Sequence, residues 1–157
     1  MSIAPQDLVE AALSVASLPC VSWVRERTEA NLRWANNALI TNGEMRSRTL
    51  TVTATADVED GTAAGTVSQE IAGVADVAAV VAAAEGLART GRPAEDAAPM
   101  VQNYAHNDVW PDPPETTSIE VLDELAKGLG DAFERAEAAR FSELVAVGVY
   151  AERAEIA

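Results

Sequence analysis

The sequence has few of the side chains on which most metal and redox sites depend. It contains one cysteine, Cys20, and one histidine, His106, in 157 residues. A single cysteine excludes an intrachain disulfide and a cluster of thiolate ligands. A single histidine excludes the His-Glu-x-x-His zinc motif and similar pairs. We interpret Cys20 as a small buried side chain at the start of a strand, because nothing near it in the sequence would activate a thiolate.

Basic residues are also scarce. Eleven Lys and Arg stand against 25 Asp and Glu, which gives a formal net charge of −14. Such a chain repels the phosphates of nucleic acids and of anionic lipids, so we expect no nucleic-acid partner and no membrane partner. No apolar run reaches the length of a transmembrane helix, and the N-terminus lacks the basic region of a secretory signal. The sequence therefore favours a cytoplasmic protein.

Aromatic side chains are rare, since Phe, Trp and Tyr together make up 4% of the residues. Alanine supplies much of the apolar share, and each alanine buries little surface. We therefore expect the three Trp, two Phe and two Tyr to contribute more to packing than their number indicates.

The apolar residues that are present follow helical and strand periods in turn. Helical spacing predicts helices at 5–17 and 74–88, and a capping-box pattern at Thr117–Glu120 predicts a third helix to about Ala139. Strands are predicted at 20–27, 31–34, 50–56, 62–70 and 144–150. Five prolines predict a long loop at 93–115. Gly65, inside a predicted strand, indicates a bulge or a close approach of another backbone.

Two turn signals lie close together in the stretch NLRWANNALITNG, residues 31–43. Asn36-Asn37 tolerates positive φ, and Asn42-Gly43 is the strongest two-residue hairpin signal in the chain. Together they predict two reversals about six residues apart, and hence a β-meander. After them, Leu50, Val52, Ala54 and Ala56 alternate with threonines, which predicts a strand with one buried face.

These elements predict a single α+β domain over residues 1–157. We expect an antiparallel-rich sheet of about five or six strands, a β-meander, covered on one face by two or three helices. Because the last predicted strand runs to the end of the sequence, we expect the natural chain to continue.

Two groups of side chains are candidates for binding. Five arginines cluster in the predicted meander and could form a basic strip for a peptide carboxylate or an acidic partner: Arg25, Arg27, Arg33, Arg46 and Arg48. The interpretation we favour instead pairs them across strands with Glu26, Glu29 and Glu44. His106 with Asp108, Asp112 and Glu115 could hold a cation, but we interpret this segment as a solvated acidic loop.

Several stretches resemble the N-terminal domain of the TldD/PmbA proteins, also called modulators of DNA gyrase. They are residues 31–43, GTAAGTVSQ at 61–69, and PAEDAAPMV at 93–101. The order of helix, meander, helix, loop, helix and strand is similar too. The stretch RTLTVTATAD at 48–57 departs from the family, where this strand is often rich in glycine, and so favours the non-catalytic subunit type.

The resemblance implies a cytoplasmic metalloprotease system that degrades or processes unstructured peptides and works as a homodimer or heterodimer. In that family a His-Glu-x-x-x-His motif holds zinc in a region beyond the N-terminal domain. None of those ligands has a counterpart here, so we predict no catalytic, metal or cofactor-binding residue in this chain. The chain would help to shape the substrate chamber and the dimer. The alternatives are a free-standing module that captures extended peptides on an exposed sheet edge, and a small enzyme that uses His106.

Overall fold

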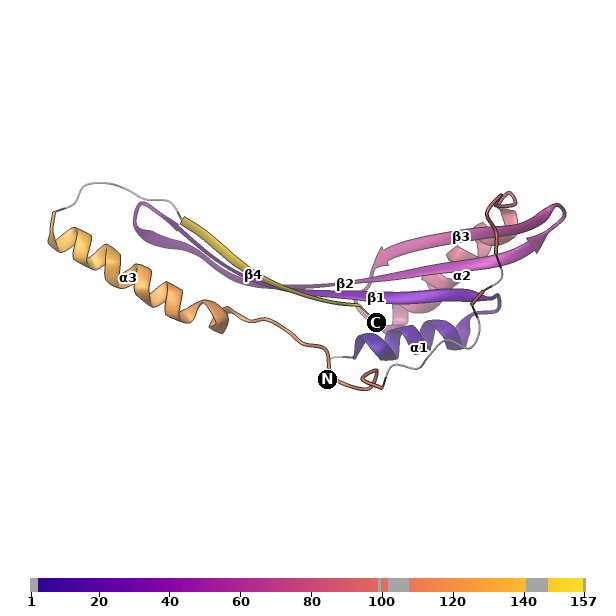
Figure 1. The fold of residues 1–157 in the computed structure, drawn as a ribbon, viewed down its shortest axis with the longest axis horizontal. Coiled ribbons are helices and arrows are strands. Elements are labelled where there is room, and N and C mark those ends of the chain that lie inside the picture. The colour runs from indigo at the N-terminus through magenta and orange to yellow at the C-terminus, as the bar shows by residue number, and fades with distance from the viewer. Residues whose placement is uncertain (1–2, 99, 102–107, 141–146, 157) are drawn as a thin grey trace. The chain divides into compact units, whose positions relative to one another are not determined.

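The computed structural model describes residues 3–98, 100–101, 108–140 and 147–156 (Figure 1). The elements follow the order α1 (Pro5–Val15), β1 (Cys20–Ala35), β2 (Ala38–Val58), β3 (Gly61–Glu70), α2 (Val74–Thr90), η1 (Ile119–Leu122), α3 (Asp123–Ala138) and β4 (Val147–Ile156). Within these residues the strands form one open antiparallel sheet in the order β3-β2-β1-β4. The predicted α+β class is confirmed, and so is the meander of β1, β2 and β3. The described sheet has four strands instead of the five or six predicted.

The strand count is lower because the predicted strands at 20–27 and 31–34 form one strand, β1, and because one of the two predicted reversals is absent. Asn36 and Asn37 form the turn between β1 and β2, with φ of 52° and 59°. Positive φ at both central residues is the geometry that suits a two-residue hairpin, so this prediction is confirmed. The second reversal is wrong, because β2 continues in extended conformation through Asn42 and Gly43. A turn there would have left a strand of only a few residues, whereas the observed hairpin has two long arms.

β2 and β3 form a second hairpin with a continuous register. It runs from Val58↔Gly61 to Thr49↔Glu70, which confirms the predicted turn at 59–61. Because every residue between these pairs has a partner, the bulge considered at Gly65 is absent. The close approach is confirmed: a Cβ built on Gly65 would lie 2.3 Å from the carbonyl oxygen of Ala84 in α2.

The described chain gathers into two compact units, and each is described by itself. Unit 1 comprises Met1–Glu26, Arg48–Pro114 and Glu155–Ala157. In its core, α1 and α2 pack on one face of β2, and the buried side chains of β2 are the predicted Leu50, Val52, Ala54 and Ala56. Helical spacing predicts a buried stripe on α2 made of Val74, Val77, Val81, Ala84 and Leu87. This is partly wrong, because Val74 and Leu87 are exposed while Val80 and Ala88 are buried.

Unit 2 comprises Arg27–Ser47 and Glu115–Ala154. Its buried core consists of Ala30, Leu32 and Trp34 of β1 and Leu122 of η1. Partly buried side chains pack against this core: Ile119, Ala126, Leu129, Phe133, Val149 and Ala151. Helical spacing predicts an apolar stripe on the third helix made of Ile119, Leu122, Leu125, Leu129 and Phe133. It is confirmed except for Leu125, which is exposed.

The predicted capping box at Thr117–Glu120 does not form. Ser118 makes no side-chain cap, and a short 3-10 helix precedes α3. Side chains of the strands satisfy the free backbone donors instead. The N–H of Thr117 donates to Thr28 Oγ1 at 3.0 Å, and the N–H of Ile119 donates to Glu44 Oε1 at 2.6 Å. The strands therefore determine where this helical segment begins.

The predicted loop contains no helix or strand over its described residues, 93–98, 100–101 and 108–115. Its C-terminal part is held on α1. Gln6 Nε2 donates to the carbonyl oxygens of Trp110 and Asp112, both at 2.9 Å, and Trp110 Nε1 donates to Glu10 Oε1 at 3.1 Å.

β4 extends past the predicted end at residue 150, and residues 144–146 lie outside the described range. No helix among the described residues is both long and apolar enough to span a membrane.

Candidate functional site

The five arginines lie at alternate positions of β1 and β2. In β1 the alternate positions Arg25 and Arg33 are exposed, and Arg27 of the same face forms an ion pair with Glu29. Arg48 of β2 lies instead among buried side chains. Arg46 is two residues away, so it projects to the same side of β2 as Arg48. The role of these arginines in binding a partner stays a prediction.

The favoured cross-strand pairing is confirmed for one pair. Arg48 Nε donates to Glu26 Oε2 at 2.6 Å, and a second guanidinium nitrogen of Arg48 forms an ion pair with the same oxygen. The side chains of Glu26 and Arg48 are only 2% and 11% exposed. A buried charge is costly unless it is paired, so each side chain of this pair depends on the other.

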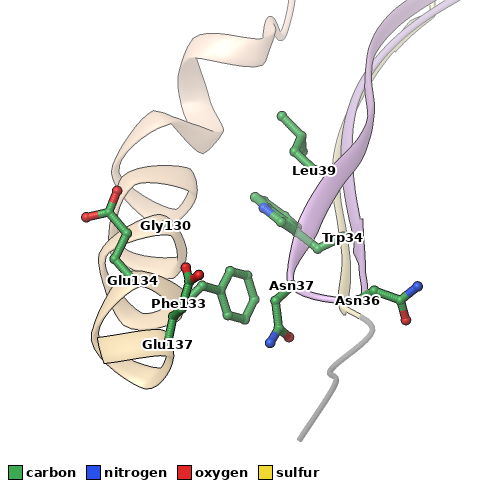
Figure 2. Close-up of a pocket in the computed structure, with 8 residues that line it drawn as sticks. All are labelled: Trp34, Asn36, Asn37, Leu39, Gly130, Phe133, Glu134 and Glu137. Atoms are coloured by element: carbon green, nitrogen blue, oxygen red, sulfur yellow. The ribbon is translucent and has the colours of Figure 1, made fainter. Parts of the chain in front are cut away.

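A pocket of about 540 Å³ lies within unit 2, between α3 and the turn end of the β1–β2 hairpin (Figure 2). Trp34 projects from β1 toward α3, and Phe133 projects from α3 toward the hairpin. The residues that line it are Trp34, Asn36, Asn37, Leu39, Gly130, Phe133, Glu134 and Glu137. The pocket thus combines an aromatic wall, two turn amides and two carboxylates.

The local sequence explains how this pocket arises. Trp34 occupies a buried-face position of β1 directly before the Asn36-Asn37 turn. Gly130 adds no side chain, and a Cβ there would meet no other atom within 4 Å. α3 is continuous through Gly130. Sequence reasoning missed the pocket because its two walls are far apart in the chain.

A buried carboxylate on α2 organises the connection between α1 and β1. Glu85 accepts hydrogen bonds from Ser17 Oγ at 2.7 Å, from the N–H of Leu18 at 2.9 Å and from Arg89 at 3.0 Å, in addition to the N–H of Ser17. These donors, first the Ser17 hydroxyl, lower the pKa of Glu85 to about 2. The Glu85 carboxylate is therefore ionised at neutral pH, and its hydrogen bonds hold the segment between α1 and β1.

The surroundings of Cys20 oppose its use as a nucleophile. Burial, and after it the charge of Glu85, raises the pKa of the Cys20 thiol, which opposes thiolate formation. No group of three or more His, Cys, Asp or Glu side chains able to hold a metal ion occurs within the described residues. His106 lies outside them, so the structure does not test its predicted role.

The edges of the sheet are β3 and β4. The loop after α2 covers the first residues of β3, where Ala63 forms a bridge with Pro93 and the N–H of Ala94 donates to Thr62 at 2.9 Å. That bridge is the one isolated pairing found in the described part of the chain. The later part of β3, from Thr66 to Glu70, is mostly exposed.

Comparison with known proteins supports a relationship at the level of the fold. No protein-family model and no curated protein sequence matches this chain. Among solved structures the chain is similar to TldE from Thermococcus kodakarensis, with a TM-score of 0.54 and 11% sequence identity. The match covers 97% of this chain and 34% of the TldE chain, so this chain spans about a third of that length. TldE is a TldD/PmbA protein, and at this identity the likeness shows the fold alone.

Proposed function

We propose that this chain acts as a non-catalytic domain of a TldD/PmbA-like metalloprotease system that processes unstructured peptides. The observation that carries the proposal is the fold likeness to TldE over 97% of this chain. The stretches at 31–43, 61–69 and 93–101 point to the same family from the sequence alone. In this proposal the zinc and its His-Glu-x-x-x-His ligands belong to a catalytic subunit, and this chain contributes to the substrate chamber and to the dimer.

The sheet of unit 1 provides a surface on which a partner subunit could pack. α1 and α2 cover one face. The other face bears hydroxyl pairs between β2 and β3, with Thr51 Oγ1 and Ser68 Oγ 2.8 Å apart and Thr53 and Thr66 2.9 Å apart. Trp23 is 39% exposed in β1. An exposed large aromatic side chain is typical of a protein interface.

The test measures assembly of the full chain with a TldD-type subunit from the same genome that carries the His-Glu-x-x-x-His motif. We expect a stable complex by analytical ultracentrifugation and zinc-dependent cleavage of an unfolded peptide only when both chains are present. Trp23→Glu should weaken the complex about tenfold or more, as for other central interface aromatics. Leu13→Glu, which changes an exposed residue of α1, is the matched control and should leave assembly unchanged.

Two results would contradict the proposal. The first is cleavage of unfolded peptides by this chain alone with added zinc. The second is the absence of any complex between this chain and the TldD-type subunit at concentrations where known subunits of this family associate.

The second candidate is a free-standing module that captures extended peptides by strand addition. The open sheet, with β3 exposed from Thr66 to Glu70, favours it. Strand addition depends on backbone hydrogen bonds, so an extended peptide should lose binding when alternate backbone nitrogens are methylated. The first candidate would be favoured if the chain forms a complex with the TldD-type subunit and the N-methylated peptides do not affect the formation of that complex.

A further inference from the structure

The pocket in unit 2 has a composition that selects one kind of guest. Among its eight lining residues, two carry a negative charge and none carries a positive charge. Glu134 and Glu137 are three residues apart, which places them on the same side of α3. Both are exposed, and in Figure 2 the carboxylate of Glu137 lies beside Phe133 while that of Glu134 points away from the hairpin.

The aromatic wall adds a second and independent preference. Trp34 is 5% exposed and belongs to the core of unit 2, and the partly buried Phe133 packs against that core. The face of an aromatic ring attracts a cation within about 6 Å of its centre, and Phe133 is the ring of the pocket that a guest can reach. Leu39 is half exposed and supplies apolar surface beside the rings. A long side chain with an apolar stem and a cationic end satisfies each of these features at once.

The other classes of guest fit less well. An anion would meet the two carboxylates of Glu134 and Glu137 without a compensating cation in the lining. A purely apolar guest would remove water from those carboxylates and from the turn amides without replacing their hydrogen bonds. The volume of about 540 Å³ lies inside the range of about 300–1,000 Å³ that is common for ligand sites. It exceeds what one side chain needs, which leaves room for adjoining backbone and water.

We propose that this pocket binds the side chain of an arginine or lysine in an extended polypeptide, with the guanidinium or ammonium group beside the ring of Phe133 and the carboxylate of Glu137, and with Glu134 adding to the negative charge of the pocket. This inference rests on the proposed function, because it names a feature of the polypeptide that the system handles. It assigns to unit 2 a preference for basic residues.

The experiment titrates the full chain with blocked peptides and follows backbone amides by NMR. The probes are acetyl-Ala-Arg-Ala-amide, the same peptide with citrulline in place of arginine, and agmatine as a free guanidinium. We expect the arginine peptide to shift amides at 34–39 and 130–137, and the neutral citrulline peptide to bind about tenfold more weakly. Agmatine should also bind more weakly, because it lacks the adjoining backbone. Raising the salt concentration should weaken the binding of the arginine peptide.

The variants test the named side chains without disturbing the core. Glu134→Gln with Glu137→Gln removes two exposed charges and should reduce affinity for the arginine peptide about tenfold. Glu120→Gln with Glu124→Gln is the matched control, since it removes the same charge from exposed residues outside the pocket. Its affinity should stay within twofold of the wild type. Phe133→Leu keeps an apolar side chain and should lower affinity by removing a ring.

Equal binding of the arginine and citrulline peptides would overturn the proposal, and so would full affinity in the Glu134 and Glu137 double variant. Equal affinity for agmatine would overturn the assignment to a polypeptide in favour of a free guanidinium or amine. These measurements use the chain without a partner subunit. A failed complex with the TldD-type subunit would therefore refute the proposed function while leaving the binding result intact, and a missing arginine preference would refute this inference alone.

Discussion

Replacing Gly65 with alanine should move α2 away from β3. A Cβ at this position would lie 2.3 Å from the carbonyl oxygen of Ala84, 2.4 Å from the nitrogen of Ala88 and 2.6 Å from Leu87 Cβ. Two of these atoms belong to the helix backbone, so no side-chain rotation relieves the contact. Because ordinary contacts begin near 3.4 Å, α2 must retreat by about 1 Å, and a gap of that size costs about a quarter to a half of each dispersion contact it opens.

The size of the effect follows from what the helix buries. Val77, Val80, Val81 and Ala84 of α2 are all nearly inaccessible to solvent in the core of unit 1. Overpacking a well-filled core costs about 1–3 kcal/mol, and here a whole helix face is displaced, so we expect a loss near 3 kcal/mol. Replacing glycine with alanine also lowers the conformational entropy of the unfolded chain, which stabilises the folded state by about 0.5–1 kcal/mol. The net loss in the free energy of unfolding should be about 2 kcal/mol.

Gly86→Ala is the matched control on the same helix. A Cβ at Gly86 would meet nothing within 4 Å, so the substitution should stabilise α2 by about 0.5–1 kcal/mol through helix propensity. Urea unfolding followed by circular dichroism, with amide hydrogen exchange of α2, measures both variants. A chain of this size changes its melting temperature by about 2–4 °C per kcal/mol. If Gly65→Ala is as stable as the wild type, α2 does not pack against β3 at this point and the reasoning is refuted.

Three further predictions concern single side chains. Glu26→Gln leaves the buried Arg48 guanidinium without its carboxylate and should cost about 3–5 kcal/mol in urea unfolding, whereas changing both residues to Met should recover most of that loss; an equal loss in the double variant would contradict this. The pKa of Glu85 is about 2 when folded, below its unfolded value, so its contribution to stability is present above about pH 4.5 and is lost as the pH falls toward 2. The stability difference between the wild type and Glu85→Gln should therefore shrink from pH 7 to pH 3, and a constant difference would refute it. Gly43→Thr should be neutral or should stabilise the protein by up to about 1 kcal/mol, because Gly43 lies inside β2. Asn37→Val should cost about 1–2 kcal/mol, because φ is 59° at this position. Thermal unfolding measures both variants, and the opposite order of stability would indicate that the chain turns at Asn42-Gly43.

The two asparagine turn signals show why local sequence predicts only part of this fold. Asn42-Gly43 is the stronger hairpin signal by type, yet the chain turns at Asn36-Asn37. A dipeptide offers a turn at little cost but does not require it. The outcome depends on which reversal gives the longer paired arms, and this is a property of the whole of β1 and β2.

The interrupted strand prediction has a similar cause. The buried face of β1 continues from Val24 through Glu26 and Thr28 to Ala30. Two polar residues on that face hide the period-two pattern, so the sequence predicts two short strands where one long strand forms. Glu26 is tolerated there because Arg48 pairs with it, and Thr28 because it accepts a hydrogen bond from the N–H of Thr117. Both partners are distant in sequence, and neither pairing can be assigned from periodicity.

The pocket lies at the limit of what the sequence can indicate. The scarcity of aromatic residues gave a valid reason to attend to Trp34 and Phe133, and both do pack in one core. Nothing local showed that they would meet, because their meeting requires the Asn36-Asn37 turn at one wall and a continuous α3 through Gly130 at the other. The pocket presents carboxylates and rings, so the positive charge in the proposed contact comes from the polypeptide that it binds.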